Sequence, residues 1–171
     1  MRPFYAVDPG VRCTGWALFS AEGVLVSCGA VKSPKGQPVA EVAGLVSERL
    51  FGGCAPLPVV VELPQVYRSS RSKGDPNDLV AVATIAGAVA AQADRAVYVS
   101  PHQWKGSVPK AAQLSRYIVH RRNEKALDDA GCAAYRSGLA PWAASLRHNI
   151  ADAVGIGLYA LRVRLLDSAN T

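Results

Sequence analysis

The chain has 171 residues, which is enough for one domain and hardly for two. Half of the residues are apolar and 19% are charged, so a wholly disordered chain is excluded. The formal net charge of +6 favours a polyanionic binding partner.

The first part of the chain predicts three strands, a helix and a fourth, buried strand. Short β-type runs, separated by turns that contain glycine, predict strands over 4–7, 14–19 and 24–31. Apolar residues at helical spacing predict a helix over 38–52. The continuous valine-rich run 58–62 predicts a strand that is buried on both faces, as in a parallel or mixed sheet.

The rest of the chain predicts mostly helices. In chain order we expect a helix over about 76–93, a strand over 96–99, a loop over 101–108, a basic helix over about 109–121, a short helix near 123–131 within an irregular part (122–146), and a last helix over about 148–166. Three consecutive strands followed by helical crossovers predict an α/β fold. We expect one mixed five-stranded sheet, a three-strand meander plus two parallel strands, with helices on both faces in a single domain over 1–171.

The sequence predicts a soluble, cytoplasmic protein with no membrane partner. The longest uncharged stretch, 79–93, is shorter than the roughly 20 apolar residues of a membrane span. Asp8 and Arg12 interrupt the first apolar run, so we expect no signal peptide. The four cysteines lack CxxC spacing, which argues against a zinc ribbon and suits a reducing compartment.

The excess positive charge is confined to the middle of the chain. Residues 63–127 hold ten of the 19 Lys and Arg residues but only four of the 13 acids. This concentration indicates nucleic-acid binding, and the alternative is a solvated surface that keeps the protein soluble. The basic residues concerned include Arg68, Arg71, Lys73, Lys105, Lys110, Arg116, Arg121 and Arg122.

Two acids end strands of the predicted sheet. Asp8 follows the first strand, and Glu62 ends the valine-rich one. Ligands of open α/β sheets gather outside the carboxyl ends of parallel strands. If these strands are parallel neighbours, about 4.8 Å apart, the two carboxylates converge and need a counter-charge, most simply a divalent cation. The alternative is two strand-end acids that face water, each paired with a nearby base.

A third acid opens an apolar helical segment. Asp152 precedes residues 153–161, which carry no charge, and a buried unpaired carboxylate there would be costly. His148 and Asn149, four and three residues earlier, share its face of the helix. The alternative is that Asp152 only stabilises the positive end of the helix dipole.

An ordered set of motifs resembles the RuvC-type Holliday junction resolvases. The motifs are DPG at 8–10 with TGWA at 14–17, VVVE at 59–62 followed by PQVY at 64–67, KGDPNDL at 73–79, PHQWKG at 101–106, and ADA at 151–153. KGDPNDL and PHQWKG are similar to the phage-encoded branch of the family. The resemblance extends over about residues 4–160, nearly the whole chain.

The resemblance implies an RNase H-like fold and a homodimer that nicks two strands of a four-way DNA junction symmetrically, in recombination and repair. Asp8, Glu62 and Asp152 would then hold two Mg²⁺ ions, with Mn²⁺ able to substitute and no nucleotide cofactor. The fourth ligand of the family lies one turn before the last acid, where this chain offers His148 or Asn149. We favour His148, because imidazole is the better ligand or proton acceptor.

Other residues have expected roles beside these ligands. In the resemblance, Lys105 and Lys110 contact DNA or assist near the scissile phosphate, and ordinary solvated lysines are the alternative. The basic loop 68–73 suits phosphate contacts. Tyr67 either stacks on an unpaired base or packs at the base of the loop. No site role is expected for four further side chains: Trp104 and Trp142, in the core or a dimer interface; His102, in a loop; and His120, facing solvent.

Other functions fit parts of this pattern. An RNase H-like nuclease could instead act on branched forks, flaps or RNA–DNA hybrids. A non-catalytic junction-binding protein is a second alternative, although three acids would repel phosphates unless a metal is present. The DPG turn also suggests a sugar-kinase-like ATPase, but that fold needs two duplicated domains and a second glycine-rich phosphate loop. We therefore expect a crossover junction endodeoxyribonuclease.

Overall fold

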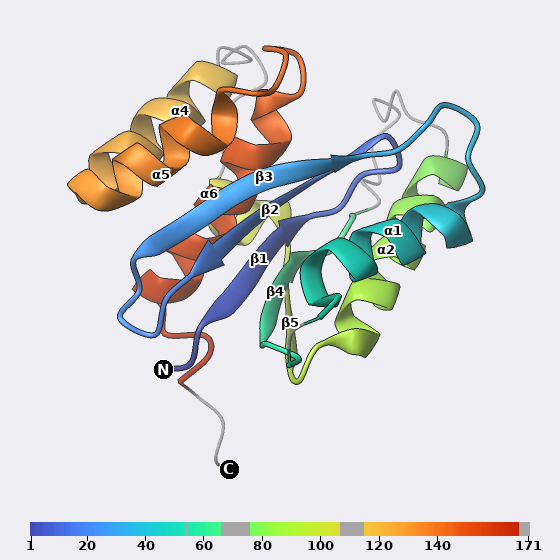
Figure 1. The fold of residues 1–171 in the computed structure, drawn as a ribbon, viewed down its shortest axis with the longest axis horizontal. Coiled ribbons are helices and arrows are strands. Elements are labelled where there is room, and N and C mark those ends of the chain that lie inside the picture. Colours follow the sequence, from blue (N-terminus) through green and yellow to red (C-terminus); the bar gives the residue numbers. More distant parts are fainter. Residues whose placement is uncertain (54, 66–75, 107–114, 168–171) are drawn as a thin grey trace.

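Five strands form one mixed sheet in the order β3-β2-β1-β4-β5 (Figure 1). The computed structural model describes residues 1–53, 55–65, 76–106 and 115–167. β1 pairs antiparallel with β2 and parallel with β4, so the predicted meander and the two parallel strands are confirmed. The strands are β1 (Phe4–Asp8), β2 (Cys13–Phe19), β3 (Leu25–Lys32), β4 (Val59–Glu62) and β5 (Ala96–Val99).

Helices cover both faces of this sheet (Figure 1). α1 and α2 lie on one face, whereas α6 crosses the other face with α4 and α5 beside it. No helix in the described part of the chain is long and apolar enough to span a membrane. The helices are α1 (Val39–Phe51), α2 (Pro76–Gln92), α3 (Pro101–Lys105), α4 (Ser115–Ala126), α5 (Asp129–Leu139) and α6 (Arg147–Arg162).

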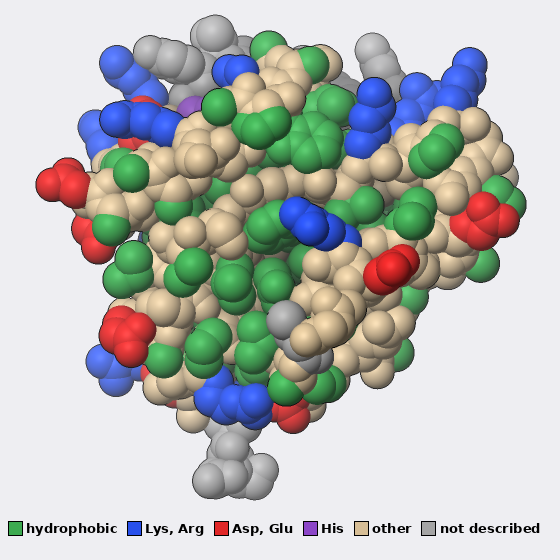
Figure 2. Space-filling view, viewed as in Figure 1, with side chains coloured by type: hydrophobic (Ala, Val, Ile, Leu, Met, Phe, Trp, Pro, Cys, Tyr) green, Lys and Arg blue, Asp and Glu red, His purple; other side chains and the backbone are tan. Residues whose placement is uncertain are grey.

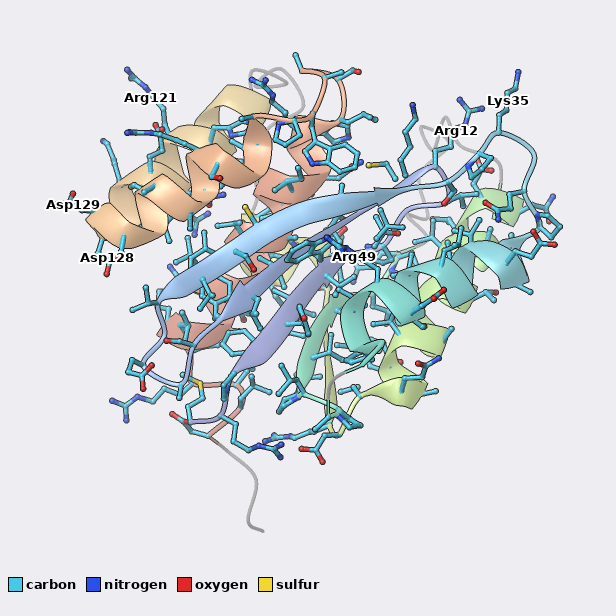
Figure 3. All side chains as sticks on the ribbon, in the orientation of Figure 1. Arg12, Lys35, Arg49, Arg121, Asp128 and Asp129 are labelled. Atoms are coloured by element: carbon cyan, nitrogen blue, oxygen red, sulfur yellow. The ribbon has the colours of Figure 1, made fainter. Side chains whose placement is uncertain are left out.

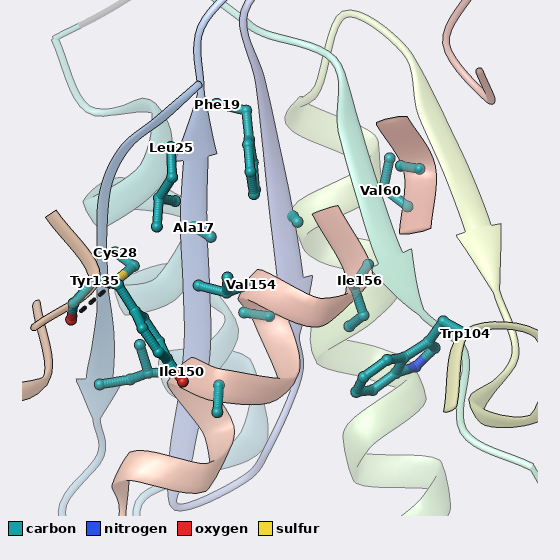
Figure 4. Packing of buried hydrophobic residues seen from close by; sticks show 14 of the residues in the cluster. Ala17, Phe19, Leu25, Cys28, Val60, Trp104, Tyr135, Ile150, Val154 and Ile156 are labelled. Carbon is teal, nitrogen blue, oxygen red and sulfur yellow. Dashed lines mark hydrogen bonds between the residues drawn. The ribbon is translucent and has the colours of Figure 1, made fainter. Parts of the chain in front are cut away.

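The valines of β4 explain why the sheet is covered on both sides. Side chains alternate along a strand, so Val59 and Val61 face the core under α1 and α2, whereas Val60 faces the core under α6. All three valines are fully buried. The packing of α6 on its face includes Ile150 and Val154 (Figure 4). The prediction of a strand buried on both faces is therefore confirmed, and it places β4 inside the sheet, next to β1.

The predicted loop after β5 is wrong, because its first five residues form the short helix α3. Ser100 and Gln103 make a capping box: the Ser100 hydroxyl accepts from the backbone of Gln103, and the Gln103 side chain accepts from the backbone of Ser100. Pro101 occupies the first turn, where a missing N–H costs nothing. A Ser-x-x-Gln signal for this helix was therefore present in the sequence.

The helices after residue 114 also differ from the predicted ones. The predicted start of the basic helix near 109 lies outside the described residues, and its predicted end at 121 is too early, because α4 continues to Ala126. The next helix spans Asp129–Leu139 rather than 123–131, since the Asp128 carboxylate caps it by accepting from the Gly131 N–H at 2.7 Å. The part expected to be irregular is thus largely helical.

The last helix ends earlier than predicted, at Arg162 rather than near Leu166. Arg164 adopts a left-handed conformation with φ 54°, and the N–H of Leu165 bonds back to the carbonyl of Ala160. This is a Schellman-type end, which usually carries glycine at the left-handed position. The arginine at that position explains why the sequence did not signal the stop.

Candidate active site

The sheet brings two of the three predicted acids together. β1 and β4 are parallel neighbours with Val7 opposite Val61, so Asp8 and Glu62 follow side by side at the carboxyl ends. Each acid comes two residues after a strand residue that faces α6. Every second side chain of a strand points to the same face, so both acids point to the face that α6 covers. Asp152 lies on α6 itself. The predicted convergence of Asp8 and Glu62 is therefore observed.

The negative charges of Glu62 and Asp152 lie close enough to Asp8 to affect its ionisation. Burial raises the pKa of Asp8 well above its ordinary value, and the negative charges of Asp152 and Glu62 raise it further. Burial also raises the pKa of Glu62, with Lys105 acting in the opposite direction. Carboxylates that raise one another's pKa in this way are stabilised by a nearby positive charge.

Lys105 supplies a positive charge to this group. Its Nζ lies 2.9 Å from Oδ2 of Asp152 and 3.8 Å from Oε2 of Glu62. Burial alone would lower the pKa of Lys105, but the two carboxylates outweigh it and raise that pKa, so the ammonium stays charged. Lys105 thus lies against two of the predicted acids and is not an ordinary solvated lysine, whereas its expected contact with DNA stays a prediction.

Trp104 is a site residue that sequence reasoning missed. Its indole Nε1–H donates to Oε2 of Glu62 at 2.5 Å, and only 3% of the residue is exposed. The ring packs against Gly155 of α6, where an added Cβ would lie 2.7 Å from Cζ3 of the indole. Trp104 was expected in the core or in a dimer interface, and the structure places it in the core. Its hydrogen bond to an acid of the site had no signal in the sequence.

The first turn of α6 rests on the strand next to Asp8. Gly15 of β2 pairs with Asp8 across the ladder. A Cβ at Gly15 would lie 2.0 Å from the backbone oxygen of Asn149, so only glycine permits this contact. His148 is half-buried on the same turn.

A polar network holds α4 and α5 against this end of α6. Asn123 is 1% exposed, and its Nδ2 donates to the carbonyl of Ala151 at 2.8 Å, one residue before Asp152. His120 does not face solvent as expected: its Nδ1 lies 2.5 Å from the Tyr135 hydroxyl, and burial lowers its pKa. His120 is therefore a structural residue whose burial depends on the neighbouring helix α5.

The donor set fits a hard divalent cation. Three carboxylates at one end of the sheet provide the oxygen ligands that Mg²⁺ and Mn²⁺ prefer. Within the described part of the chain, however, the side chains of no three His, Cys, Asp or Glu residues lie close enough together to form a metal-binding cluster. The Lys105 ammonium already contacts two of the carboxylates. A cation at this site would therefore enter beside Lys105 or displace it.

The predicted DNA-binding residues are only partly described. Arg121 and Arg122 are exposed on α4, and Arg122 donates to the backbone oxygen of Trp104 at 3.4 Å. Lys105 is described above. The other predicted residues lie outside the described residues, or have a side chain that does: Tyr67, Arg68, Arg71, Lys73, Lys110 and Arg116.

Basic residues from the N-terminal part also lie at this end of the molecule. Figure 2 shows Lys and Arg side chains gathered at the end opposite the two termini. Arg12 and Lys35 are exposed there, at the same end as Arg121 (Figure 3). Sequence reasoning missed Arg12 and Lys35, because the positive and negative charges of residues 1–62 cancel.

No protein-family model and no curated protein sequence match the chain. Solved structures do match it. Thermus thermophilus RuvC in complex with a Holliday junction substrate has a TM-score of 0.56 and 19% identity, over 95% of this chain and 96% of that one. The Fowlpox virus resolvase, in a complex with Holliday junction DNA, has a TM-score of 0.60 and 16% identity over 95% and 99%. The yeast mitochondrial Holliday junction resolvase Ydc2 has a TM-score of 0.58 and 12% identity over 95% and 82%. The chain therefore has the RNase H-like fold of the RuvC-type Holliday junction resolvases.

Proposed function

We propose that the protein is a structure-selective DNA endonuclease that resolves four-way junctions by symmetric, metal-dependent phosphodiester hydrolysis. One observation carries this proposal: in a RuvC-type fold, Asp8, Glu62 and Asp152 are gathered at the carboxyl ends of two parallel strands. Two of the matching solved structures are complexes with Holliday junction substrate or DNA, which supports branched DNA as the substrate.

We propose that Asp8, Glu62 and Asp152 hold two Mg²⁺ ions, for which Mn²⁺ can substitute. Divalent cations at such a site supply activation of the attacking water and stabilisation of the leaving oxygen. Asp8 is our candidate for the ligand that the two ions would share. It lies on the central strand, and the negative charges of both other acids raise its pKa. The partial burial of the carboxylates keeps bulk water away from them and strengthens their electrostatic interactions.

Lys105 is proposed to change partners during the reaction. In the free protein its ammonium neutralises Asp152 and Glu62. Cations held by these acids would neutralise them, and the Lys105 ammonium could then contact the scissile phosphate. About one third of the Lys105 side chain is exposed. Lys110, for which we propose a similar contact, lies outside the described residues.

Either His148 or Asn149 is proposed to complete the ligand set. The backbone of Asn149 packs against Gly15, the ladder partner of Asp8, and this place near Asp8 supports Asn149. The greater basicity of an imidazole supports His148, which could also accept a proton from the attacking water. Comparison of the two alanine variants, described in the Discussion, separates these assignments.

We propose that the enzyme acts as a homodimer, since symmetric nicking requires two sites. The exposed face of α2 supports this proposal because it is uncharged, and Val80 at its start is 66% exposed. This face consists of Val80, Ala83, Thr84, Gly87 and Ala91. Light scattering should give the mass of a dimer for the wild type, and Val80→Glu should shift it towards the monomer if α2 forms the interface.

A cleavage assay tests the proposed function. Wild type and Asp8→Asn would be incubated in Mg²⁺ with an immobile four-way junction, linear duplex, a flap and an RNA–DNA hybrid. Asp129→Asn, an exposed acid of α5 remote from the site, is the matched control. We expect paired symmetric nicks in the junction alone, with wild type and Asp129→Asn but not with Asp8→Asn. Cutting of the flap or hybrid instead would keep the nuclease and discard the junction assignment. Tight binding without cutting in Mg²⁺ or Mn²⁺ would indicate a binding protein.

A further inference from the structure

Trp104 links three elements that carry the candidate site. Its indole N–H donates to Glu62 at the end of β4, its ring packs on Gly155 of α6, and the Lys105 ammonium lies 4.4 Å from the ring centroid. Trp104 is 3% exposed, so it is not accessible to a nucleobase.

Backbone pairing and helix capping bring Trp104 close to Glu62. In the sheet, Glu62 pairs with Val99, the last residue of β5, and Ser100 caps α3 directly after it. The capping box therefore holds Trp104 in place close to Glu62. Arg122 of α4 adds a hydrogen bond to the carbonyl of Trp104.

We infer that Trp104 is a positioning residue that sets the metal affinity of the site by orienting the Glu62 carboxylate. This inference rests on the proposed function of Glu62 as a ligand. The indole N–H engages Oε2, which leaves Oε1 of Glu62 for a cation. Without the indole donor, Oε2 of Glu62 has only the Lys105 ammonium beside it, and the Glu62 side chain loses its fixed orientation. Loss of such an outer-shell partner typically weakens metal binding about 10- to 100-fold.

Packing alone is the competing explanation for Trp104. It predicts that any aromatic ring of suitable size preserves metal binding. Trp104→Phe keeps a ring but removes the N–H donor. Site-specific replacement of Trp104 by 3-benzothienylalanine keeps the shape of the indole with sulfur in place of N–H, so it tests the donor even if Trp104→Phe fails to fold. Trp142→Phe, at a partly buried tryptophan packed on the same core, is the matched control.

The experiment is a Mn²⁺ titration of the DNA-free protein, with free Mn²⁺ measured by electron paramagnetic resonance. We expect Kd for Mn²⁺ to rise about 10- to 100-fold in both Trp104 variants and to stay unchanged in Trp142→Phe. Junction binding in EDTA should match the wild type, and cleavage should recover as Mn²⁺ is raised. Wild-type Mn²⁺ affinity in the benzothienyl variant would overturn the inference and leave the proposed function intact. A wild-type protein that binds no Mn²⁺ would overturn the proposed metal site and this inference with it.

Discussion

Removal of the Lys105 ammonium should destabilise the metal-free protein by about 2 kcal/mol. Its Nζ lies 2.9 Å from Asp152 and 3.8 Å from Glu62. At an effective dielectric constant of about 20, these separations correspond to attractions of about 6 and about 4 kcal/mol. Desolvation of the three groups offsets most of that attraction. Because a third of Lys105 is exposed, the net loss should fall between the figure for an exposed pair, about 1 kcal/mol, and that for a fully buried one, about 3–5 kcal/mol.

Urea unfolding of Lys105→Met in EDTA measures this loss directly. Lys125→Met removes the same charge from an exposed position on α4 and is the control. In saturating Mg²⁺ we expect the deficit of Lys105→Met to shrink, because the cation takes over the neutralisation of the acids. A ligand at about 100 times its Kd stabilises the folded state by about 2.7 kcal/mol. Equal stability of Lys105→Met and wild type in EDTA would refute the reasoning, and so would a deficit that Mg²⁺ leaves unchanged.

Three further predictions concern the acids and the first turn of α6. Because burial and the charges of the other two acids raise the pKa of Asp8, its folded carboxyl holds a proton more tightly than the unfolded chain does. The unfolding free energy in EDTA should therefore fall as pH rises through that raised pKa. The Asp8→Asn variant should lack this fall and should be more stable than the wild type at neutral pH. Urea titrations at several pH values would measure both effects. His148→Ala should cost more cleavage activity than Asn149→Ala if His148 is the fourth ligand, and the reverse order would reassign the role to Asn149. Gly15→Ala forces a Cβ to within 2.0 Å of the backbone oxygen of Asn149. Thermal unfolding should show a loss of stability of about 1–3 kcal/mol or more. A variant as stable as the wild type would show that α6 can shift freely.

Local patterns in the sequence were sufficient for the sheet and for the place of its acids. The valine-rich run before Glu62 could be buried only inside a sheet covered on both faces, and the run before Asp8 had the same strand character. Parallel crossovers bring the carboxyl ends of such strands to one edge. Asp152, at the opening of an apolar helix, was recognisable for a similar reason. These inferences depend on alternation and burial, which are properties of single segments.

The predictions for α3 and for the start of α5 were wrong although the sequence carries a local capping signal for each helix. The capping box of Ser100 and Gln103 encodes α3, and Asp128 encodes the start of α5. The end of α6 lacks such a signal, because the residue in the left-handed conformation after the helix is an arginine and not the usual glycine.

The contacts that define the chemistry of the site were decided by the tertiary structure alone. The hydrogen bond from Trp104 to Glu62 joins residues 42 positions apart, and the ion pair of Lys105 with Asp152 joins residues 47 positions apart. No pattern within one segment encodes such pairs, because they depend on how α3 sits between β4 and α6. The burial of His120 likewise depends on a hydroxyl from another helix. The sequence by itself thus indicated the acids and the lysine of the candidate site. The packing of helices on the sheet placed Trp104 among them and decided how these groups are neutralised and held.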